Sequence, residues 1–139
     1  MEVLEDRSVK VVTSAGPIWL AGVSDFKTAQ HDVHAALGGV TKDAPVLVIT
    51  HNPDVFPQLP EGVNLTIAGH THGGQVRLPL IGSPIVPSVY GQRFAAGHII
   101  EGNRQLYVAT GVGTSIIPVR FGVPPSISVL TLSSSCPRV

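Results

Sequence analysis

The chain has 139 residues, the length of one domain of ordinary size, which is enough to bury a hydrophobic core. Nine lysines and arginines balance nine aspartates and glutamates, so the chain does not have the net positive charge typical of a nucleic-acid binder, and no nucleic-acid partner is expected. Charged residues make up 13% of the sequence, about half of the share usual in soluble domains. Two interpretations are open: a strand-rich domain with many small residues, or a surface that another chain covers.

Short apolar runs separated by glycine and proline predict a strand-rich chain with one helix. The strands are expected, in chain order, at 8–13, 18–23, 46–50, 64–68, 94–100, 105–110 and 127–132. The helix is expected at 28–37, before Gly38 and Gly39, and one short helical turn at 53–59. Three prolines make 78–90 an irregular loop. We therefore predict an α/β (α+β) fold, a single domain over 1–139 with a flexible tail at 133–139.

Histidines follow two of these predicted strands. The runs 46–50 and 64–68 are continuously apolar, as in strands of a sheet that is covered on both faces. His51 follows the first run, and the sequence Gly69-His70-Thr71-His72-Gly73-Gly74 follows the second. In extended backbone, residues i and i+2 point to the same side, so His70 and His72 are expected to reach one small volume. Sites in open α/β sheets form at the carboxyl ends of strands, and we predict a metal site from these three histidines.

Three further side chains are weaker candidates for this chemistry. His31 and His34 lie three residues apart on the predicted helix, where they can share one face and act as extra metal ligands. A solvated helix face explains them as well. Arg120, in the second glycine-rich region, is a candidate contact for a phosphate oxygen, and a surface salt bridge is its alternative.

Five segments carry a resemblance that extends from about residue 9 to residue 132, roughly the whole chain. They are Leu20-Ala21-Gly22-Val23, His51-Asn52-Pro53-Asp54-Val55-Phe56, Gly69-His70-Thr71-His72-Gly73-Gly74-Gln75-Val76, Tyr90-Gly91, and Gly113-Thr114-Ser115 through Pro118-Val119-Arg120-Phe121. Together they resemble the C-terminal half of the calcineurin-like metallophosphoesterases, and within that superfamily the bacterial branch whose members are often membrane-associated phosphohydrolases.

The resemblance implies half of a β-sandwich flanked by helices and a centre of two divalent metal ions. By the same resemblance, His51 and His70 bind one ion and His72 binds the other. The ions expected are manganese, iron, zinc or nickel. The three earlier metal-binding motifs of the family, with the carboxylate that bridges the two ions, have no counterpart before His51. The site is therefore expected to be incomplete in this chain.

The resemblance implies a metal-dependent phosphoesterase, which hydrolyses phosphomonoesters or phosphodiesters by a metal-bound hydroxide. No residue is assigned as catalytic, and activity of this chain alone is in doubt. A homo-oligomer or a complementary N-terminal half is expected to complete the site. The alternatives are a catalytically silent metal-binding or interaction domain, and a mononuclear three-histidine zinc hydrolase. We expect no signal peptide and no membrane segment in this sequence, so its expected location is the cytoplasm or is left open.

Overall fold

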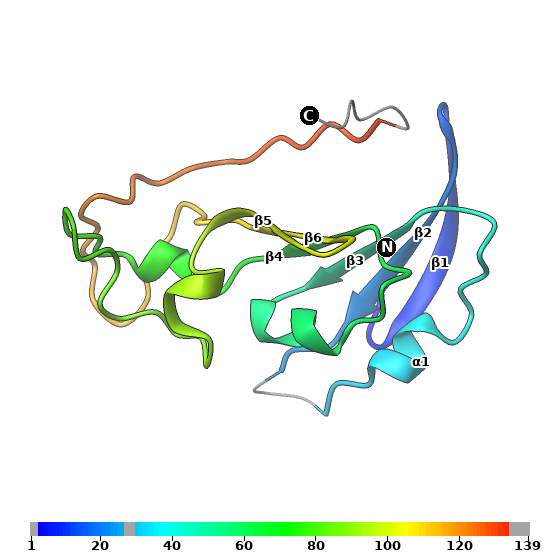
Figure 1. The fold of residues 1–139 in the computed structure, drawn as a ribbon, viewed down its shortest axis with the longest axis horizontal. Coiled ribbons are helices and arrows are strands. Elements are labelled where there is room, and N and C mark those ends of the chain that lie inside the picture. The colour runs from blue at the N-terminus through cyan, green and yellow to red at the C-terminus, as the bar shows by residue number, and fades with distance from the viewer. Residues whose placement is uncertain (1–2, 27–29, 134–139) are drawn as a thin grey trace.

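The computed structural model describes residues 3–26 and 30–133, which form one six-stranded mixed sheet in the order β1-β2-β3-β4-β6-β5 (Figure 1). The strands are β1 (Arg7–Thr13), β2 (Gly16–Val23), β3 (Val46–Thr50), β4 (Leu65–Ala68), β5 (Gly97–Glu101) and β6 (Arg104–Val108). The helices are α1 (Val33–Leu37) and the 3-10 turns η1 (Pro53–Gln58), η2 (His72–Gly74) and η3 (Gly91–Phe94). The predicted strand-rich α/β class is confirmed.

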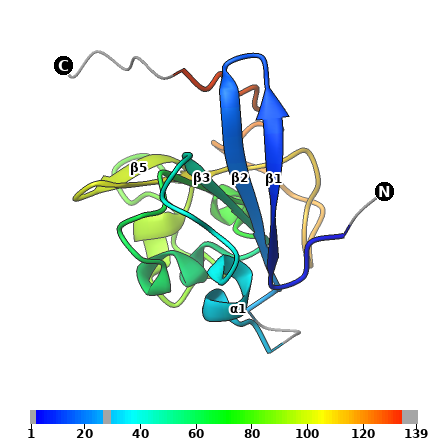
Figure 2. The same cartoon turned by 90° about the vertical axis from the view of Figure 1, so that its right-hand side faces the viewer.

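Four central strands are parallel and two hairpins close the sheet at its edges. Strands β2, β3, β4 and β6 pair in parallel, whereas β1 and β5 pair antiparallel with β2 and β6. Gly102 adopts φ 61° in the turn between β5 and β6, a conformation that favours glycine. The turn between β1 and β2 lies well beyond the other strands (Figure 2). The parallel pairing brings the carboxyl ends of β3 and β4 to the same edge of the sheet.

One face of the sheet carries the core. The helices lie on this side (Figure 1), and the side chains beneath them are buried. Phe56 of η1 and Phe94 of η3 are both fully buried, with ring centroids 5.8 Å apart in an edge-to-face arrangement. The guanidinium of Arg104 lies 5.0 Å above the Phe56 ring and donates to the Leu59 carbonyl at 2.7 Å. The packing of the two aromatic rings and the hydrogen-bonded guanidinium of Arg104 thus fix η1 and η3 to the sheet.

The opposite face, which we call the open face, is apolar and uncovered. Strand register places these side chains on it: Val9, Val11, Ile18, Leu20, Leu47, Ile49, Leu65, Ile67, Ile100 and Tyr107. All of them are partly or largely exposed, including Ile49 at the centre of the sheet, at 45%. The expectation that β3 and β4 are covered on both faces is wrong for the described part of the chain. On the open face only two extended segments of it lie against the sheet, the C-terminal segment and the stretch around Leu4, which packs on Gly22 of β2.

The predicted helix at 28–37 is too long. Residues 28 and 29 lie outside the described residues, and 30–32 are not helical. The helix begins after Asp32, whose side chain accepts a hydrogen bond from the Ala35 amide at 2.9 Å and so caps the first turn. His31 therefore precedes the helix that His34 belongs to, and the two do not share a helical face.

The strand predicted at 127–132 is also wrong, because this segment is extended but has no partner strand among the described residues. It lies on the side of the sheet opposite α1 (Figure 1), where the Tyr107 hydroxyl donates to Ser128 at 2.8 Å. Ile127 and Val129 remain mostly exposed. Of the expected tail at 133–139, only Ser133 lies within the described residues.

A hydrogen-bonded carboxylate joins the edge hairpin to the loop before β3. Asp43 accepts hydrogen bonds from Lys10 of β1, from Thr41 and from the indole nitrogen of Trp19 in β2. These bonds, that from Lys10 foremost, hold the pKa of Asp43 well below the usual 3.8. The ionised carboxylate is thus the form that the folded state favours.

The Asp43→Asn variant is predicted to lose less stability in acid than the parent. A carboxylate with a lowered pKa in the folded state stabilises it above about pH 4, and this contribution disappears as the pH falls through the folded-state value. Urea unfolding followed by fluorescence of Trp19, the only tryptophan, at neutral pH and at about pH 3 measures the difference. The exposed Glu61→Gln control is expected to behave like the parent. Equal acid losses in parent and Asp43→Asn would contradict the assignment.

Candidate metal centre

The turns after β3 and β4 meet at the carboxyl edge of the sheet. The Gly69 amide donates to the His51 carbonyl at 3.0 Å, so the two turns are joined through the backbone. His51 Nε2 and His70 Nδ1 lie 3.1 Å apart, and the two rings meet edge-to-face with centroids 4.8 Å apart. The structure therefore brings His51 and His70 together, each from its own strand end.

The second turn is left-handed and not extended. His70 and His72 have φ angles of 67° and 51°, a region that costs free energy for residues other than glycine. The expectation that both point to one side from extended backbone is wrong, because strand β4 ends at Ala68. His72 Nδ1 lies instead 3.4 Å from Nη2 of Arg120. The turn is held by the Thr71 hydroxyl, which donates to the Ala95 carbonyl at 2.7 Å.

The spacing of His51 and His70 fits two ligands of one divalent ion. Two nitrogens bound to a tetrahedral zinc ion at ordinary bond lengths are about 3.3 Å apart, and ligands at right angles around an octahedral ion are about 2.9 Å apart. The observed 3.1 Å lies between these values. Over residues 3–26 and 30–133, no group of three histidines, cysteines, aspartates or glutamates is close enough to hold an ion. The described chain thus supplies a ligand pair, and His72 stands apart from it.

Arg120 lies beside His72, and its side chain is committed to backbone carbonyls. Its guanidinium donates to the carbonyls of Thr110 at 2.8 Å and Gly113 at 2.9 Å. These bonds fix the loop around Arg120 to the end of β6. Nη1 of Arg120 makes a longer bond, to the Val123 carbonyl at 3.4 Å, and its second N–H can donate to a further acceptor such as a phosphate oxygen.

His31 and His34 lie elsewhere. His31 Nε2 is 3.1 Å from the side-chain oxygen of Gln58, and its ring packs against Phe26 at 4.8 Å. His34 is exposed on α1, the helix that packs against β1 and β2. Both are therefore separate from the edge where β3 and β4 end, and the structure does not bring them to His51 and His70.

Asp54 and Gln75 hold distant loops beside the histidines. Both lie in segments that carry the resemblance, but the sequence alone did not predict this role. Asp54 is buried and accepts hydrogen bonds from the Ser88 hydroxyl and, at 3.0 Å, from the Val89 amide. Gln75 donates to the Ser115 carbonyl at 3.0 Å and accepts from the Ser115 amide. Each follows a histidine turn within a few residues and ties a distant loop to it. Spacing in the sequence contains no signal for such long-range partners.

The chain is similar to curated proteins that are named metallophosphoesterases. It is 42% identical over 131 residues to the phosphodiesterase YaeI of Escherichia coli, which covers 94% of this chain and 47% of the relative. It is 34% identical over 119 residues to the uncharacterized metallophosphoesterase YkuE of Bacillus subtilis, at 85% and 41% coverage. The matches lie in the C-terminal part of the relatives, so the chain spans less than half of their length. No solved structure and no protein-family profile matches it.

Replacing Asp54 by alanine is expected to release the loop that contains Ser88 and Val89. Two donors lose their acceptor at a buried position, so the free energy of unfolding is expected to fall by about 1–3 kcal/mol. Hydrogen exchange at the Val89 amide should accelerate well beyond the global change, because its bond to Asp54 is lost. Glu61→Ala, at an exposed position, is the matched control. Unchanged protection of Val89 in Asp54→Ala would refute the anchoring role.

Proposed function

The chain belongs to the calcineurin-like metallophosphoesterase superfamily and corresponds to the C-terminal part of its members, and we propose that it contributes His51, His70 and His72 to a metal-dependent phosphoesterase site. Members of this family use divalent metal ions. The reaction proposed is hydrolysis of a phosphomonoester or phosphodiester. We further propose that polypeptide outside the described residues completes the site.

The pair of His51 and His70 is the observation that carries this proposal. In the described state, one ring donates a hydrogen bond to the other across the 3.1 Å between Nε2 and Nδ1. A divalent ion in the same place would replace the shared proton, with both nitrogens as donors of lone pairs. When bound, such an ion supplies a nucleophile from water and neutralises charge on phosphoryl oxygens. The left-handed turn keeps the His70 ring at the strand end, ready for this role.

His72 and Arg120 are proposed for the second half of the site. The resemblance assigns His72 to a second ion, and among the described residues His72 does not join His51 and His70 in a group of three ligands. Arg120 holds the neighbouring loop in place through its carbonyl bonds and lies 3.4 Å from His72 Nδ1. We propose that Arg120 positions His72 and that its Nη1 contacts the substrate phosphate.

The open face supports completion by a complementary N-terminal part. The chain has an accessible surface of 8826 Å², whereas a compact monomer of 14.5 kDa has about 6,900 Å². The excess is larger than the roughly 800 Å² that each partner of a standard protein interface buries, and the extended C-terminal segment contributes part of it. The ten apolar side chains of the open face could be covered by a further protein layer. The extended segment 126–132 lies beside this face. A second copy of this chain is the alternative cover.

A catalytically silent metal-binding or interaction domain is the second candidate function. The observation that favours it is the described chain's lack of a three-ligand group, since two histidines alone hold an ion weakly. The same observation gives no support to a mononuclear three-histidine zinc hydrolase, because His72 does not join the other two in this conformation.

Metal binding and turnover separate these candidates. Calorimetric titration with zinc or manganese is expected to show one weak site on the chain, with an affinity about tenfold lower or worse after His70→Ala. His98→Ala, which removes an exposed histidine bonded to Gln105, is the matched control. Hydrolysis of bis(p-nitrophenyl) phosphate is expected only after the chain is co-expressed with the N-terminal part of the Escherichia coli relative, and His70→Ala should abolish it.

Two outcomes would contradict the phosphoesterase proposal. Stable assembly with the N-terminal part and full metal loading, but without turnover, would indicate the silent domain. Metal binding that is identical in His70→Ala and the parent would remove the histidine pair from the site. Turnover by the chain alone would show that it needs no complementary part.

A further inference from the structure

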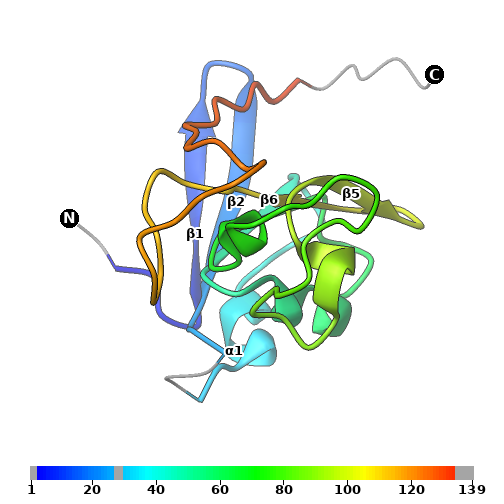
Figure 3. The ribbon, with the colours of Figure 1, turned by 90° about the vertical axis from the view of Figure 1, so that its left-hand side faces the viewer.

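Two cavities lie between the segment that follows η2 and the segment that follows β6, at the end of the molecule that faces the viewer in Figure 3. The two segments are joined through their backbones, since the Arg77 amide donates to the Phe121 carbonyl at 2.7 Å and the Phe121 amide donates to the Gln75 carbonyl at 2.8 Å. The outer cavity has a volume of about 540 Å³ and the inner cavity of about 310 Å³. Arg77, Gln92 and Gly122 line both, so the two cavities adjoin.

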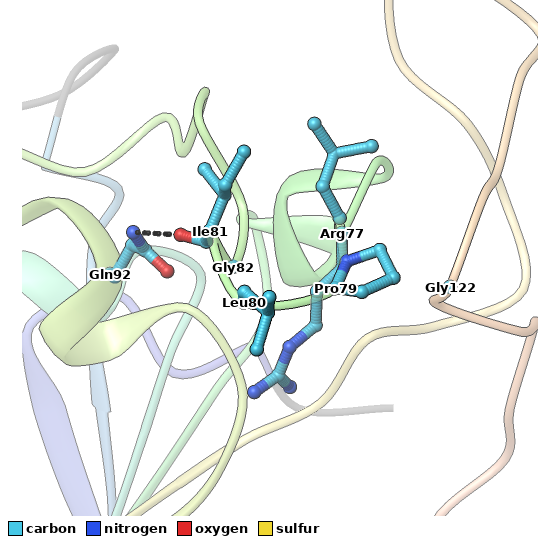
Figure 4. A pocket seen from close by; sticks show the side chains of 8 residues that line it. Arg77, Pro79, Leu80, Ile81, Gly82, Gln92 and Gly122 are labelled. Atoms are coloured by element: carbon cyan, nitrogen blue, oxygen red, sulfur yellow. Dashed lines mark hydrogen bonds between the residues drawn. The ribbon is translucent and has the colours of Figure 1, made fainter.

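Arg77, where the two cavities meet, has a guanidinium without a partner among the described residues. Over 3–26 and 30–133 it makes no hydrogen bond and no ion pair. In Figure 4 a dashed line joins Gln92 to Ile81, whereas none reaches Arg77. The other described arginines after β4 are bonded elsewhere, to Glu101 or to backbone carbonyls: Arg93, Arg104 and Arg120. Arg77 is therefore the arginine whose whole guanidinium is available to a ligand.

Neutral donors surround the inner cavity. The hydroxyls of Thr110 and Ser126 lie 2.7 Å apart and share one hydrogen bond, so whichever of them donates, the other keeps its proton for a ligand. Gln92 Nε2 donates to a backbone carbonyl at 3.3 Å and retains a second N–H. The buried Ser83 fixes this wall, because its hydroxyl donates to the Gly73 carbonyl at 2.8 Å and its amide donates to Gln92 Oε1 at 3.0 Å.

No acidic side chain of the described ranges offsets these donors, since neither cavity is lined by an aspartate or a glutamate. Asp54 is buried and accepts hydrogen bonds from Ser88 and Val89. Glu101 is paired with Arg93 at 2.8 Å. The cavities therefore combine one unpaired positive charge with neutral donors, an arrangement that favours an anionic group.

We propose that the two cavities form a binding site for a phosphate group of a small molecule, with Arg77 as its charged donor. The planar guanidinium presents paired N–H groups that match two phosphate oxygens. The remaining oxygens accept from Gln92 and from the hydroxyl of Thr110 or Ser126. The site is formed by this chain and uses none of the histidines at 51, 70 and 72, so it does not rest on the proposed phosphoesterase function.

The inner cavity shares a wall with the turn that contains His72. Gly73, the next residue, lines the cavity, and a Cβ at Gly73 would lie 2.7 Å from Cγ1 of Val123, so this wall is closely packed. Thr110 and Val123 also line the cavity, and their carbonyls accept from Arg120 at 2.8 and 3.4 Å. Arg120 in turn lies 3.4 Å from His72 Nδ1. A phosphate group in the cavity is therefore expected to lie beside the candidate metal centre and to change the environment of the Gly73 amide.

Titration of the chelator-treated chain with sodium phosphate at constant ionic strength, followed by ¹H–¹⁵N NMR, tests the proposal. Saturable shifts are expected for the Arg77 Nε–H and the Gly73 amide. Arg77→Gln should weaken phosphate binding about fivefold or more, and its fold should be retained because the guanidinium bonds to no described residue. Lys42→Gln removes the same charge at an exposed position that lines neither cavity and should bind phosphate like the parent.

The hydroxyl pair and a second anion provide two further comparisons. Thr110→Val/Ser126→Ala removes two hydroxyls that bond to each other, so neither leaves a partner unsatisfied, and phosphate binding should weaken about threefold. Acetate should bind the parent more weakly than phosphate, because it carries less charge and has fewer oxygens for the donors of the cavity.

Four results would overturn the proposal. The first is the absence of saturable shifts in the parent, and the second is equal weakening in Arg77→Gln and Lys42→Gln. The third is acetate binding as tight as phosphate binding, which would indicate a carboxylate site. The fourth is a set of shifts confined to His51 and His70, which would place the anion at the histidine pair.

Discussion

The parallel pairing of β3 with β4 is the constraint on which the candidate site depends. Ile49 pairs with Ile67 in this register, so both strands end at the same level and deliver His51 and His70 to one place. The Gly69 amide donates a hydrogen bond to the His51 carbonyl. The two turns are therefore joined through the backbone, independently of their side chains. A shift of one residue in this register would turn every apolar side chain of β4 to the other face and would separate the two imidazoles.

Hydrogen bonds between distant parts of the chain also hold the surroundings of the histidines in place. Asp54 and Gln75 follow the histidine turns and bind backbone groups of loops that come much later in the chain. The left-handed conformations of His70 and His72 cost free energy, and this network keeps the turn in place against that cost. The loops that contain Val89 and Ser115 are thus positioned by the same turns that present the histidines. The positions of the histidines and the conformation of the neighbouring loops therefore depend on the same hydrogen bonds, those of Asp54 and Gln75.

Local pattern predicted much of the fold, and the errors have physical causes. Strand β3 and the β5–β6 hairpin were predictable because an apolar run and a glycine turn are local signals. The helix at 28–37 was predicted too long, since Asp32 caps the helix later than the apolar spacing indicates. The strand at 127–132 has strand-like residues but no neighbour to pair with. The resemblance identified the histidine segments, whereas the left-handed turn and the anchors depend on tertiary contacts, which no local pattern contains.

The low proportion of charged residues leaves two interpretations open, and the placement of the exposed apolar side chains bears on both. If small residues in a strand-rich domain were the whole explanation, exposed apolar side chains would be scattered singly, as on most proteins. The ten apolar side chains of the open face instead lie on adjacent strands, so their exposure is contiguous. Scattered exposure needs no partner, but contiguous exposure of this extent favours a covering surface. Because this face is flat and formed by strands, it is suited to a protein layer that packs across the sheet.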